Sequence, residues 1–421
     1  MDNRQSESTD HRIKQSNTQP QGLTRAMSFF DVACLGINSV VGAGIFLLPG
    51  QLFNLAGNAA LWVFPLCGVL CFIISLCFAE MGGMYNKTGG AYLYAREAFG
   101  PFTGFLVGWM MWLSSIIGWA SVASGFGLYL EYFLPTGNGW LSRTIIAILI
   151  VGLSSVNYFG VKQGARTINF FTIGKLVSLL IFIVVGLLFM HGDNPSLSPF
   201  NKGMQGGLLD GNFNAAAIMA LYAYTGFEFV VVPAEEMRHP QRDIPRVLFL
   251  VLMIATGLYI VVQIVAIGTF PGLAASDKPL ADAARYFMGT AGGVIIGVGA
   301  LLSIGGINAG IALTSPRSLY VLSVDGFFPK IFSKIHPVYH TPYLAIIVNT
   351  ALTLLLSLTG SFKYLIAASV MVSILQYIPT CLAVVVLRRY RPEMERSYRI
   401  PGGYSVTSLQ DRKSTRLNSS H

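Results

Sequence analysis

Charged residues are scarce in this sequence. Only 11% of its 421 residues are Asp, Glu, Lys or Arg, whereas 53% are hydrophobic. A soluble domain usually has about a quarter of its residues charged, so this chain has too few charges to cover a water-exposed surface. The five cysteines all fall inside apolar runs, where cysteine behaves as a small hydrophobe, and they indicate neither a disulfide framework nor a zinc site. The composition therefore points to the membrane.

Motifs for nucleotide binding and hydrolysis are missing as well. The sequence contains no Gly-x-x-x-x-Gly-Lys-Ser/Thr loop, no His-Glu-x-x-His motif and no Gly-x-Ser-x-Gly motif. An ATP-driven pump or a hydrolase of these classes would need one of them. We therefore expect that the protein is not an enzyme and uses no cofactor or metal.

Apolar runs of about 20 residues, long enough to cross a hydrocarbon core of ~30 Å, recur from Phe29 onward. They predict an all-α polytopic membrane protein with about ten spans in two sets of five. The expected spans are Phe29–Phe53, Leu61–Gly83, Phe102–Phe133, Leu141–Tyr158 and Ile168–Met190, then Phe213–Ala234, Val247–Phe270, Thr290–Val321, Tyr343–Thr359 and Tyr364–Leu387. The membrane domain covers residues 29–399, with repeats at about 29–190 and 213–387.

The net charge of +9 would suggest a nucleic-acid partner in a soluble protein. Here the basic residues lie in loops between the expected spans. Nineteen of them, from Arg4 to Arg399, fall on one side, and five fall on the other, namely Arg143, Lys202, Lys278, Arg285 and Lys363. Because positively charged loops stay in the cytoplasm, this bias predicts a cytoplasmic amino terminus in the cell membrane and no nucleic-acid partner.

Polar segments flank the apolar part of the chain. Residues 1–28 lack the charged start, apolar stretch and cleavage site of a signal peptide, so we expect a disordered cytoplasmic tail there. Residues 405–421 turn abruptly polar and resemble translated sequencing-adapter sequence. We expect a non-native or disordered tail at this end and assign it no function.

Two of the expected spans contain residues that weaken a helix in mid-membrane. The first span has Gly42-Ala43-Gly44 and then Pro49-Gly50, and the sixth has Tyr224-Thr225-Gly226-Phe227-Glu228 at the matching place. Interrupted helices at matching positions of two inverted repeats indicate the binding site of a transporter. Close helix packing through small residues is the alternative interpretation of the glycines.

The chemistry of such interruptions predicts a class of ligand. Freed N–H groups at the start of a half-helix attract a carboxylate, and freed carbonyls accept hydrogen bonds from an ammonium. An α-amino acid carries both groups. No further acidic residue lies near the interruptions to hold a cationic side chain, so a neutral or apolar amino acid is favoured.

Several short motifs follow one another in a fixed order. They are Gly42-Ala43-Gly44-Ile45-Phe46, Glu80-Met81-Gly82, Gly89-Gly90-Ala91-Tyr92, Glu235-Glu236 with Ile244-Pro245-Arg246, and Ser315-Pro316-Arg317 through Asp325-Gly326. With these motifs the chain resembles the amino acid, polyamine and organocation transporter superfamily from about residue 29 to residue 399. The resemblance implies a five-plus-five inverted-repeat (LeuT-like) fold with broken first and sixth helices, and secondary active transport of amino acids by alternating access.

The resemblance also implies which residues bind the substrate. Its carboxylate is expected on the amides of Ala43 and Gly44, and its ammonium on carbonyls near Val40, Tyr222 and Thr225. Alanine at position 43 departs from relatives that have serine there, so no hydroxyl contact is expected. The full set of expected substrate-binding residues is Val40, Gly42, Ala43, Gly44, Tyr222, Thr225, Gly226 and Phe227.

Two charged residues in the spans are candidates for coupling transport to a proton gradient. Lys175 lies deep in the fifth span, where an unpaired ammonium costs several kcal/mol. In relatives that have a lysine here, its ammonium lies near the first span, at the position where sodium-coupled relatives bind a sodium ion. The alternative is a structural lysine that ties helices together without exchanging a proton. Glu228 is expected to sense protonation or to cap the broken sixth helix. Salt bridges are expected for Glu80, Glu235 and Glu236.

Other functions stay open at this point. A polyamine or organic-cation antiporter is the nearest alternative. A channel would normally show a selectivity filter or charged rings. Superfamily members usually have twelve spans, so a non-transporting remnant that lacks the last two helices is a third possibility. The sequence does not decide between symport and exchange, and it does not predict the oligomeric state.

Overall fold

The computed structural model describes residues 23–133, 139–190, 211–276, 278–359 and 362–401. Within these ranges the regular structure is helical, and the single backbone bridge pairs Met27 with Met237. The α-helices are α1 Phe29–Val40, α2 Gly44–Ala56, α3 Ala60–Gly82, α4 Ala91–Phe99, α5 Pro101–Phe133, α6 Gly139–Tyr158, α7 Val161–Phe189, α8 Gly211–Tyr224, α9 Pro240–Thr269, α10 Pro279–Val324, α11 Tyr343–Thr359 and α12 Phe362–Tyr390. Short 3₁₀ turns are η1 Gly57–Ala59, η3 Phe227–Val231, η4 Ala234–Glu236, η5 Leu273–Ala275 and η6 Lys330–Ser333.

Each of the ten expected spans corresponds to a helix, or to a pair of helical pieces, in the described part of the chain. The first span consists of α1 and α2, and the sixth consists of α8 and η3. Within the described ranges, seven stretches are long and apolar enough to cross a membrane, and the first of them, Phe29–Gly82, joins α1, α2 and α3. The expected all-α polytopic fold is therefore confirmed.

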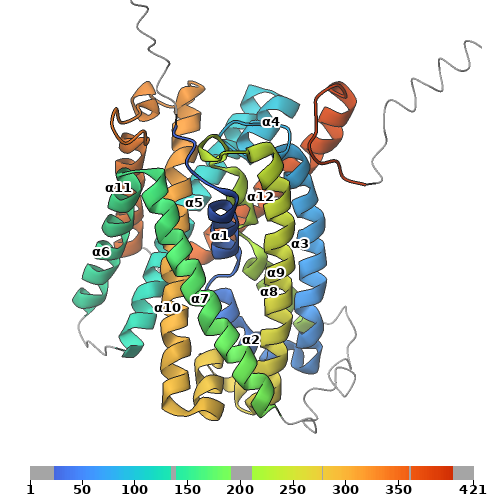
Figure 1. Ribbon diagram of the computed structural model, residues 1–421, viewed down its shortest axis with the longest axis vertical. Helices are drawn as coiled ribbons and strands as arrows, with labels where there is room; N and C mark the ends of the chain where they lie inside the picture. Colours follow the sequence, from blue (N-terminus) through green and yellow to red (C-terminus); the bar gives the residue numbers. More distant parts are fainter. Residues whose placement is uncertain (1–22, 134–138, 191–210, 277, 360–361, 402–421) are drawn as a thin grey trace, which may run out of the picture.

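The helices form a bundle around α1. This helix contacts α7, α9, α10 and η3, and Figure 1 shows it near the centre of the molecule. Its start follows from the sequence, because Ser28 and Asp31 form a capping box: the Ser28 amide donates to Asp31 Oδ2 at 2.8 Å and the Asp31 amide donates to Ser28 Oγ at 3.3 Å. Burial of α1 among other helices makes it a core element of the bundle.

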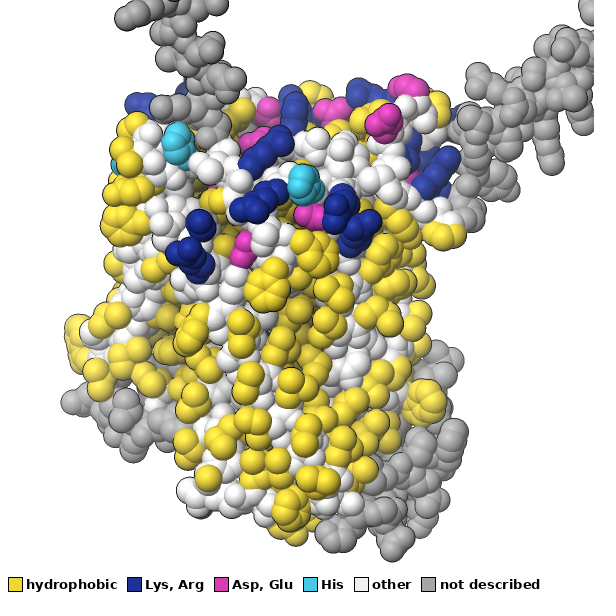
Figure 2. All heavy atoms as spheres, viewed as in Figure 1, with side chains coloured by type: hydrophobic (Ala, Val, Ile, Leu, Met, Phe, Trp, Pro, Cys, Tyr) yellow, Lys and Arg dark blue, Asp and Glu magenta, His cyan; other side chains and the backbone are white. Residues whose placement is uncertain are grey.

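The outer surface separates apolar from basic side chains. Figure 2 shows hydrophobic side chains over the body of the molecule and Lys and Arg gathered at one end, which we call the basic end. Large apolar residues on outward faces are strongly exposed, such as Phe170 at 65%, Leu188 at 79% and Val385 at 65%. Exposed apolar bodies of this extent fit a lipid environment, so this is a multi-pass membrane protein.

Some boundaries differ from the expected ones. α7 begins at Val161 rather than Ile168, because its basic first turns with Lys162 and Arg166 extend beyond the apolar run. α10 begins at Pro279 rather than Thr290, and Gly289, with φ 72°, bends it near the expected start. The nine-residue α4 was not expected at all.

The predicted amino-terminal tail is wrong for residues 23–28. Leu23 and Met27 are buried, and the Met27 amide donates to the Glu236 carbonyl at 2.9 Å. Apolar side chains and backbone pairing therefore hold this segment against the protein. Residues 1–22 and the predicted tail at 405–421 lie outside the described residues.

Candidate functional site

The first span is interrupted between Val40, where α1 ends, and Gly44, where α2 begins. The Val41 amide closes the last turn of α1 by donating to the Ile37 carbonyl at 2.8 Å. Ala43, at the N-cap of α2, makes no side-chain cap. Since the first amides of a helix have no intrahelical acceptor, the start of α2 offers N–H groups to a ligand.

The second interruption follows α8. Gly226 has φ 113°, a left-handed conformation that suits glycine, and the 3₁₀ turn η3 begins directly after it. The Tyr222 carbonyl accepts from the Thr225 amide at 3.1 Å and from Thr225 Oγ1 at 2.8 Å. The carboxylate of Glu228 accepts from the Gly226 amide at 2.8 Å. Glu228 thus caps the broken sixth helix, which is one of the two roles expected for it.

The two interruptions touch each other. A Cβ on Gly226 would collide with the carbonyl oxygen of Ser39, and a Cβ on Gly44 would lie 3.1 Å from the Cβ of Ala223. Both glycines therefore permit a close approach between the broken helices. The packing role of the glycines and their place at the breaks are not exclusive alternatives.

A cavity of about 100 Å³ lies between the interruptions. Seven of the expected binding residues line it, together with Glu228: Val40, Gly42, Ala43, Gly44, Tyr222, Thr225 and Gly226. The rest of its wall is rich in hydroxyl groups, from Ser39, Ser114, Ser115, Ser121 and Ser373. The structure thus brings the two predicted halves of the site together around one small space.

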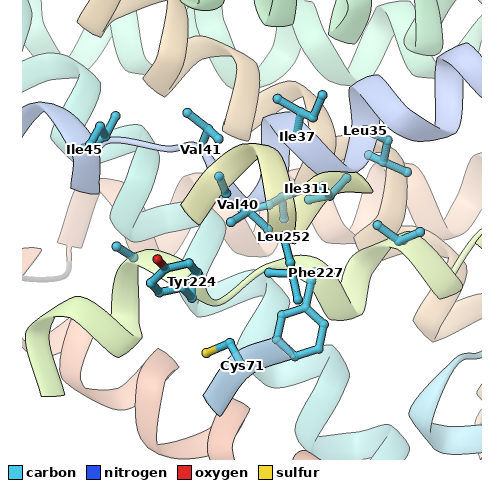
Figure 3. Close-up of a cluster of buried hydrophobic side chains, with 14 of the residues drawn as sticks. Leu35, Ile37, Val40, Val41, Ile45, Cys71, Tyr224, Phe227, Leu252 and Ile311 are labelled. Carbon is cyan, nitrogen blue, oxygen red and sulfur yellow. The ribbon is translucent and has the colours of Figure 1, made fainter. Parts of the chain in front are cut away.

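Phe227 does not line this cavity. Its ring is fully buried and packs edge-on against Phe78 and in a stack on Tyr377, with centroids 5.4 and 5.5 Å apart. Figure 3 shows it among buried hydrophobic side chains. Phe229, two residues further along η3, lines the cavity instead. The expected contact between Phe227 and the substrate is therefore not supported by its position.

Lys175, on α7, reaches the first interruption. Its fully buried ammonium donates to the Val41 carbonyl at 2.7 Å and to the Asn38 carbonyl at 3.2 Å, and it forms no ion pair with any described residue. Ser303 Oγ also donates to the Val41 carbonyl at 3.3 Å. The expected position beside the loosened first span is confirmed, whereas the coupling role stays a prediction.

Two residues at the site, Tyr259 and Ser121, were not predicted from the sequence. The fully buried hydroxyl of Tyr259, on α9, lies 2.8 Å from the Val40 carbonyl and 2.8 Å from the Ala223 carbonyl, so it links both broken helices. Ser121, on α5, lines the cavity and is only 2% exposed, and its hydroxyl has no hydrogen-bond partner among the described residues. No local pattern marks either residue, because both act across the bundle.

Acidic residues at the basic end form ion pairs, as expected for Glu80 and Glu236. Glu80 accepts from Arg388 Nε at 2.7 Å and from the Ile400 amide at 2.9 Å. Glu236 and Arg317 are both fully buried, and their shortest N–O distance is 2.8 Å. Arg317 Nη1 also donates to Asn157 Oδ1 at 3.1 Å. These pairs connect α3 with α12 and η4 with α10.

Potential metal ligands are not grouped in the described part of the chain. Among the described residues, no cluster of three or more His, Cys, Asp or Glu side chains could hold an ion. The polar part of the cavity wall consists of backbone groups, hydroxyls and one carboxylate, and the apolar part includes Val122, Phe229, Ile307 and Ile311. This donor set suits a small polar organic solute.

Comparison with known proteins agrees with this geometry. A family model described as amino acid permease matches residues 27–409. The chain is 30% identical to a methylthioribose transporter of Bacillus subtilis, over 92% of this chain and 86% of that protein. It is 30% identical to the serine/threonine exchanger SteT, over 91% and 88% of the two chains, and 28% identical to the branched-chain amino acid permease BcaP, over 91% and 85%, both of Bacillus subtilis. The chain belongs to the amino acid permease family.

Proposed function

We propose that this protein is a secondary transporter that carries small neutral amino acids across the cell membrane by alternating access. One observation carries the proposal: both interrupted helices line the same cavity. The start of α2 offers amides to a carboxylate on one side, and the end of α8 offers carbonyls and Glu228 on the other. Membership of the amino acid permease family supports it.

The substrate carboxylate is placed on the amides of Ala43 and Gly44. For the substrate ammonium, the two expected carbonyl acceptors differ in how many hydrogen bonds they already accept. The Tyr222 carbonyl already accepts twice from Thr225, and the Val40 carbonyl is within reach of the Tyr259 hydroxyl. A carbonyl has two lone pairs. Val40 therefore keeps one lone pair for the ammonium, while Tyr222 would accept it only after Thr225 turns away.

The size and lining of the cavity favour a small side chain. Pockets for drug-sized ligands measure roughly 300–1,000 Å³, and this one measures about 100 Å³. Glu228 is the sole acidic residue among those that line it, and its carboxylate accepts from the Gly226 amide. A polyamine or a cationic side chain would lack a free carboxylate there. Small neutral amino acids, hydroxylated or apolar, fit best.

A second candidate substrate is a small hydroxylated sugar. Five serine hydroxyls and Thr225 line the cavity, and one of the similar proteins is named a methylthioribose transporter. Such a solute carries neither a carboxylate nor an ammonium. It would bind through the hydroxyl groups alone and leave the amides of α2 unused.

Coupling and orientation complete the proposal. Lys175 and Glu228 are the charged groups next to the two interruptions, and each contacts backbone freed by a break. Protonation of either group would change the hydrogen bonds that hold the broken helices. The basic end faces the cytoplasm, because most Lys and Arg of the loops gather there.

A competition experiment tests the substrate class. Binding of labelled serine to the purified protein is measured in the presence of one of three competitors in excess: alanine, methylthioribose or ethanolamine. Ethanolamine is the decarboxylated form of serine. We expect alanine to compete well and the other two poorly. Effective competition by ethanolamine would favour an amine transporter, and effective competition by methylthioribose would favour the sugar.

Ser121→Ala provides a sharper version of the same test. A site that hydrogen-bonds a substrate hydroxyl loses affinity for that substrate alone when the bond is removed. We expect weaker binding of serine by roughly fivefold to tenfold, with little change for alanine. Equal loss for both amino acids would place the serine side chain away from Ser121.

A further inference from the structure

The basic end holds a second cavity, separate from the transport site. Its volume is about 300 Å³, and its walls include Arg25, Asn86, Arg238, His239, Gln241 and Arg242. We call it the arginine pocket. Arg25 precedes α1, Arg238 lies in the turn between η4 and α9, and Arg242 is in the first turn of α9.

Backbone pairing fixes the two sides of this pocket against each other. The amides of Ala26 and Met27 donate to the Glu236 carbonyl at 3.0 and 2.9 Å, and the Arg238 amide donates to the Met27 carbonyl at 3.1 Å. Met27 and Met237 are both fully covered by protein. The positions of Arg25 and Arg238 therefore follow from paired backbone and not from two independent loops.

The guanidinium groups are poorly neutralised by nearby carboxylates. Arg242 Nε is 3.8 Å from Asp243 Oδ1, and no closer ion pair involves Arg25, Arg238 or Arg242 among the described residues. Asp31 attracts Arg238 and Glu235 attracts Arg25 from a distance, but neither carboxylate forms an ion pair with these arginines among the described residues. Three like charges around one cavity repel each other unless an anion lies between them.

The level of the arginine pocket relative to the lipid-facing surface indicates the source of that anion. Phe29 and Phe30, which begin α1 only four residues after Arg25, are 39% and 56% exposed. Exposed phenyl rings suit the hydrocarbon, whereas arginines near the end of the same helix extend toward the headgroups. The arginine pocket therefore lies at headgroup level.

We propose that the arginine pocket binds the phosphate of an anionic phospholipid from the leaflet on the basic side. Guanidinium groups bind phosphate through paired hydrogen bonds, and basic pockets beside membrane helices hold anionic headgroups. The cytoplasmic location of this leaflet rests on the proposed orientation, whereas the site itself does not. Free phosphate has the same chemistry and is the alternative source of the anion.

A phosphate in this pocket would tie two parts of the transport machinery together. Arg25 belongs to the segment that leads into α1, and Arg242 belongs to α9, whose Tyr259 contacts both interruptions. A bound headgroup stabilises the arrangement of α1 and α9 seen here. It acts as a ligand of one conformation, and its effect equals its preference for that conformation.

Thermal unfolding of the full chain in detergent tests the proposal. The unfolding midpoint is measured against increasing short-chain phosphatidylglycerol, short-chain phosphatidylcholine or sodium phosphate at constant ionic strength. We expect stabilisation by phosphatidylglycerol. In the double variant Arg25→Gln/Arg242→Gln, the apparent affinity for phosphatidylglycerol should fall roughly 25-fold, because each arginine near an anionic headgroup contributes about a factor of five.

A matched double variant controls for net charge. Arg246→Gln/Arg389→Gln removes two exposed arginines that do not line the pocket and form no ion pair with any described residue. It should keep the wild-type response. Stabilisation by sodium phosphate that also needs Arg25 and Arg242 would support the site with a soluble anion as its ligand. Equal losses in both double variants, or no stabilisation by either anion, would overturn the proposal.

Discussion

The link between the two broken helices can be tested by removing one oxygen atom. In Tyr259→Phe the ring keeps its neighbours, since Phe64 and Tyr224 lie with ring centroids 5.1 Å from it. The hydroxyl has one hydrogen for two carbonyls, Val40 and Ala223, each at 2.8 Å. Its loss removes one hydrogen bond and leaves a buried carbonyl without a donor, which costs about 1–3 kcal/mol.

Tyr224→Phe is the matched control. The Tyr224 hydroxyl donates at 2.9 Å to the Phe64 carbonyl, inside the regular helix α3, where carbonyls already accept from amides one turn later. Its loss should cost only about 0.5–1.5 kcal/mol. We expect a lower unfolding midpoint in detergent for Tyr259→Phe than for Tyr224→Phe. An equal or larger loss in Tyr224→Phe would refute the idea that Tyr259 holds the interruptions together.

Three further predictions concern the same site and the basic end. Gly226→Ala should abolish uptake, because Gly226 has φ 113° and a Cβ there would collide with the Ser39 carbonyl. Gly257→Ala, on α9 with open space around the added Cβ, should leave uptake intact and stabilise the fold by about 0.5–1 kcal/mol. Uptake and the unfolding midpoint are measured for both variants. Lys175→Met should bind substrate, yet its uptake should no longer vary with external pH between about 5 and 8 if the lysine exchanges a proton during transport; an unchanged pH profile would make Lys175 a structural tie. Arg317→Met should lower the free energy of unfolding by about 3–5 kcal/mol, because it leaves Glu236 buried and unpaired. In a double-mutant cycle, adding Glu236→Gln should recover part of that loss. Additive losses would show that the two side chains do not stabilise each other.

The interruptions were predictable from the sequence because their causes are local. Gly42-Ala43-Gly44 and Gly226 weaken a helix wherever they stand, and both breaks occur where those residues predict them. The position of Lys175 beside the first break was likewise predictable, from the resemblance to related transporters. The ion pairs of Glu80 and Glu236 follow from the high cost of leaving a carboxylate unpaired near the membrane.

The parts that sequence did not reveal depend on contacts across the bundle. Tyr259 and Ser121 lie on regular helices with no special pattern, and only the packing of α9 and α5 brings them to the site. Phe227 was misplaced because the left-handed Gly226 and the following 3₁₀ turn decide which ring faces the cavity. Spacing along the chain does not predict that direction.

The segment before α1 was missed for a related reason. Its polar composition predicts a tail, yet two apolar side chains, Leu23 and Met27, are enough to anchor it once Glu236 offers a carbonyl. Such pairing joins residues more than 200 positions apart in the sequence. Composition averaged over a segment does not detect it.

The central claim is that the cavity between the two interruptions binds an amino acid and opens alternately to each side of the membrane. Counterflow in proteoliposomes tests it most directly: vesicles with the full chain are loaded with unlabelled serine and placed in a trace of labelled serine outside. We predict transient accumulation of label above the equilibrium level, saturable by outside serine, present in Gly257→Ala and absent in Gly226→Ala. Label that enters without accumulation or saturation, or equal counterflow in both variants, would contradict the account.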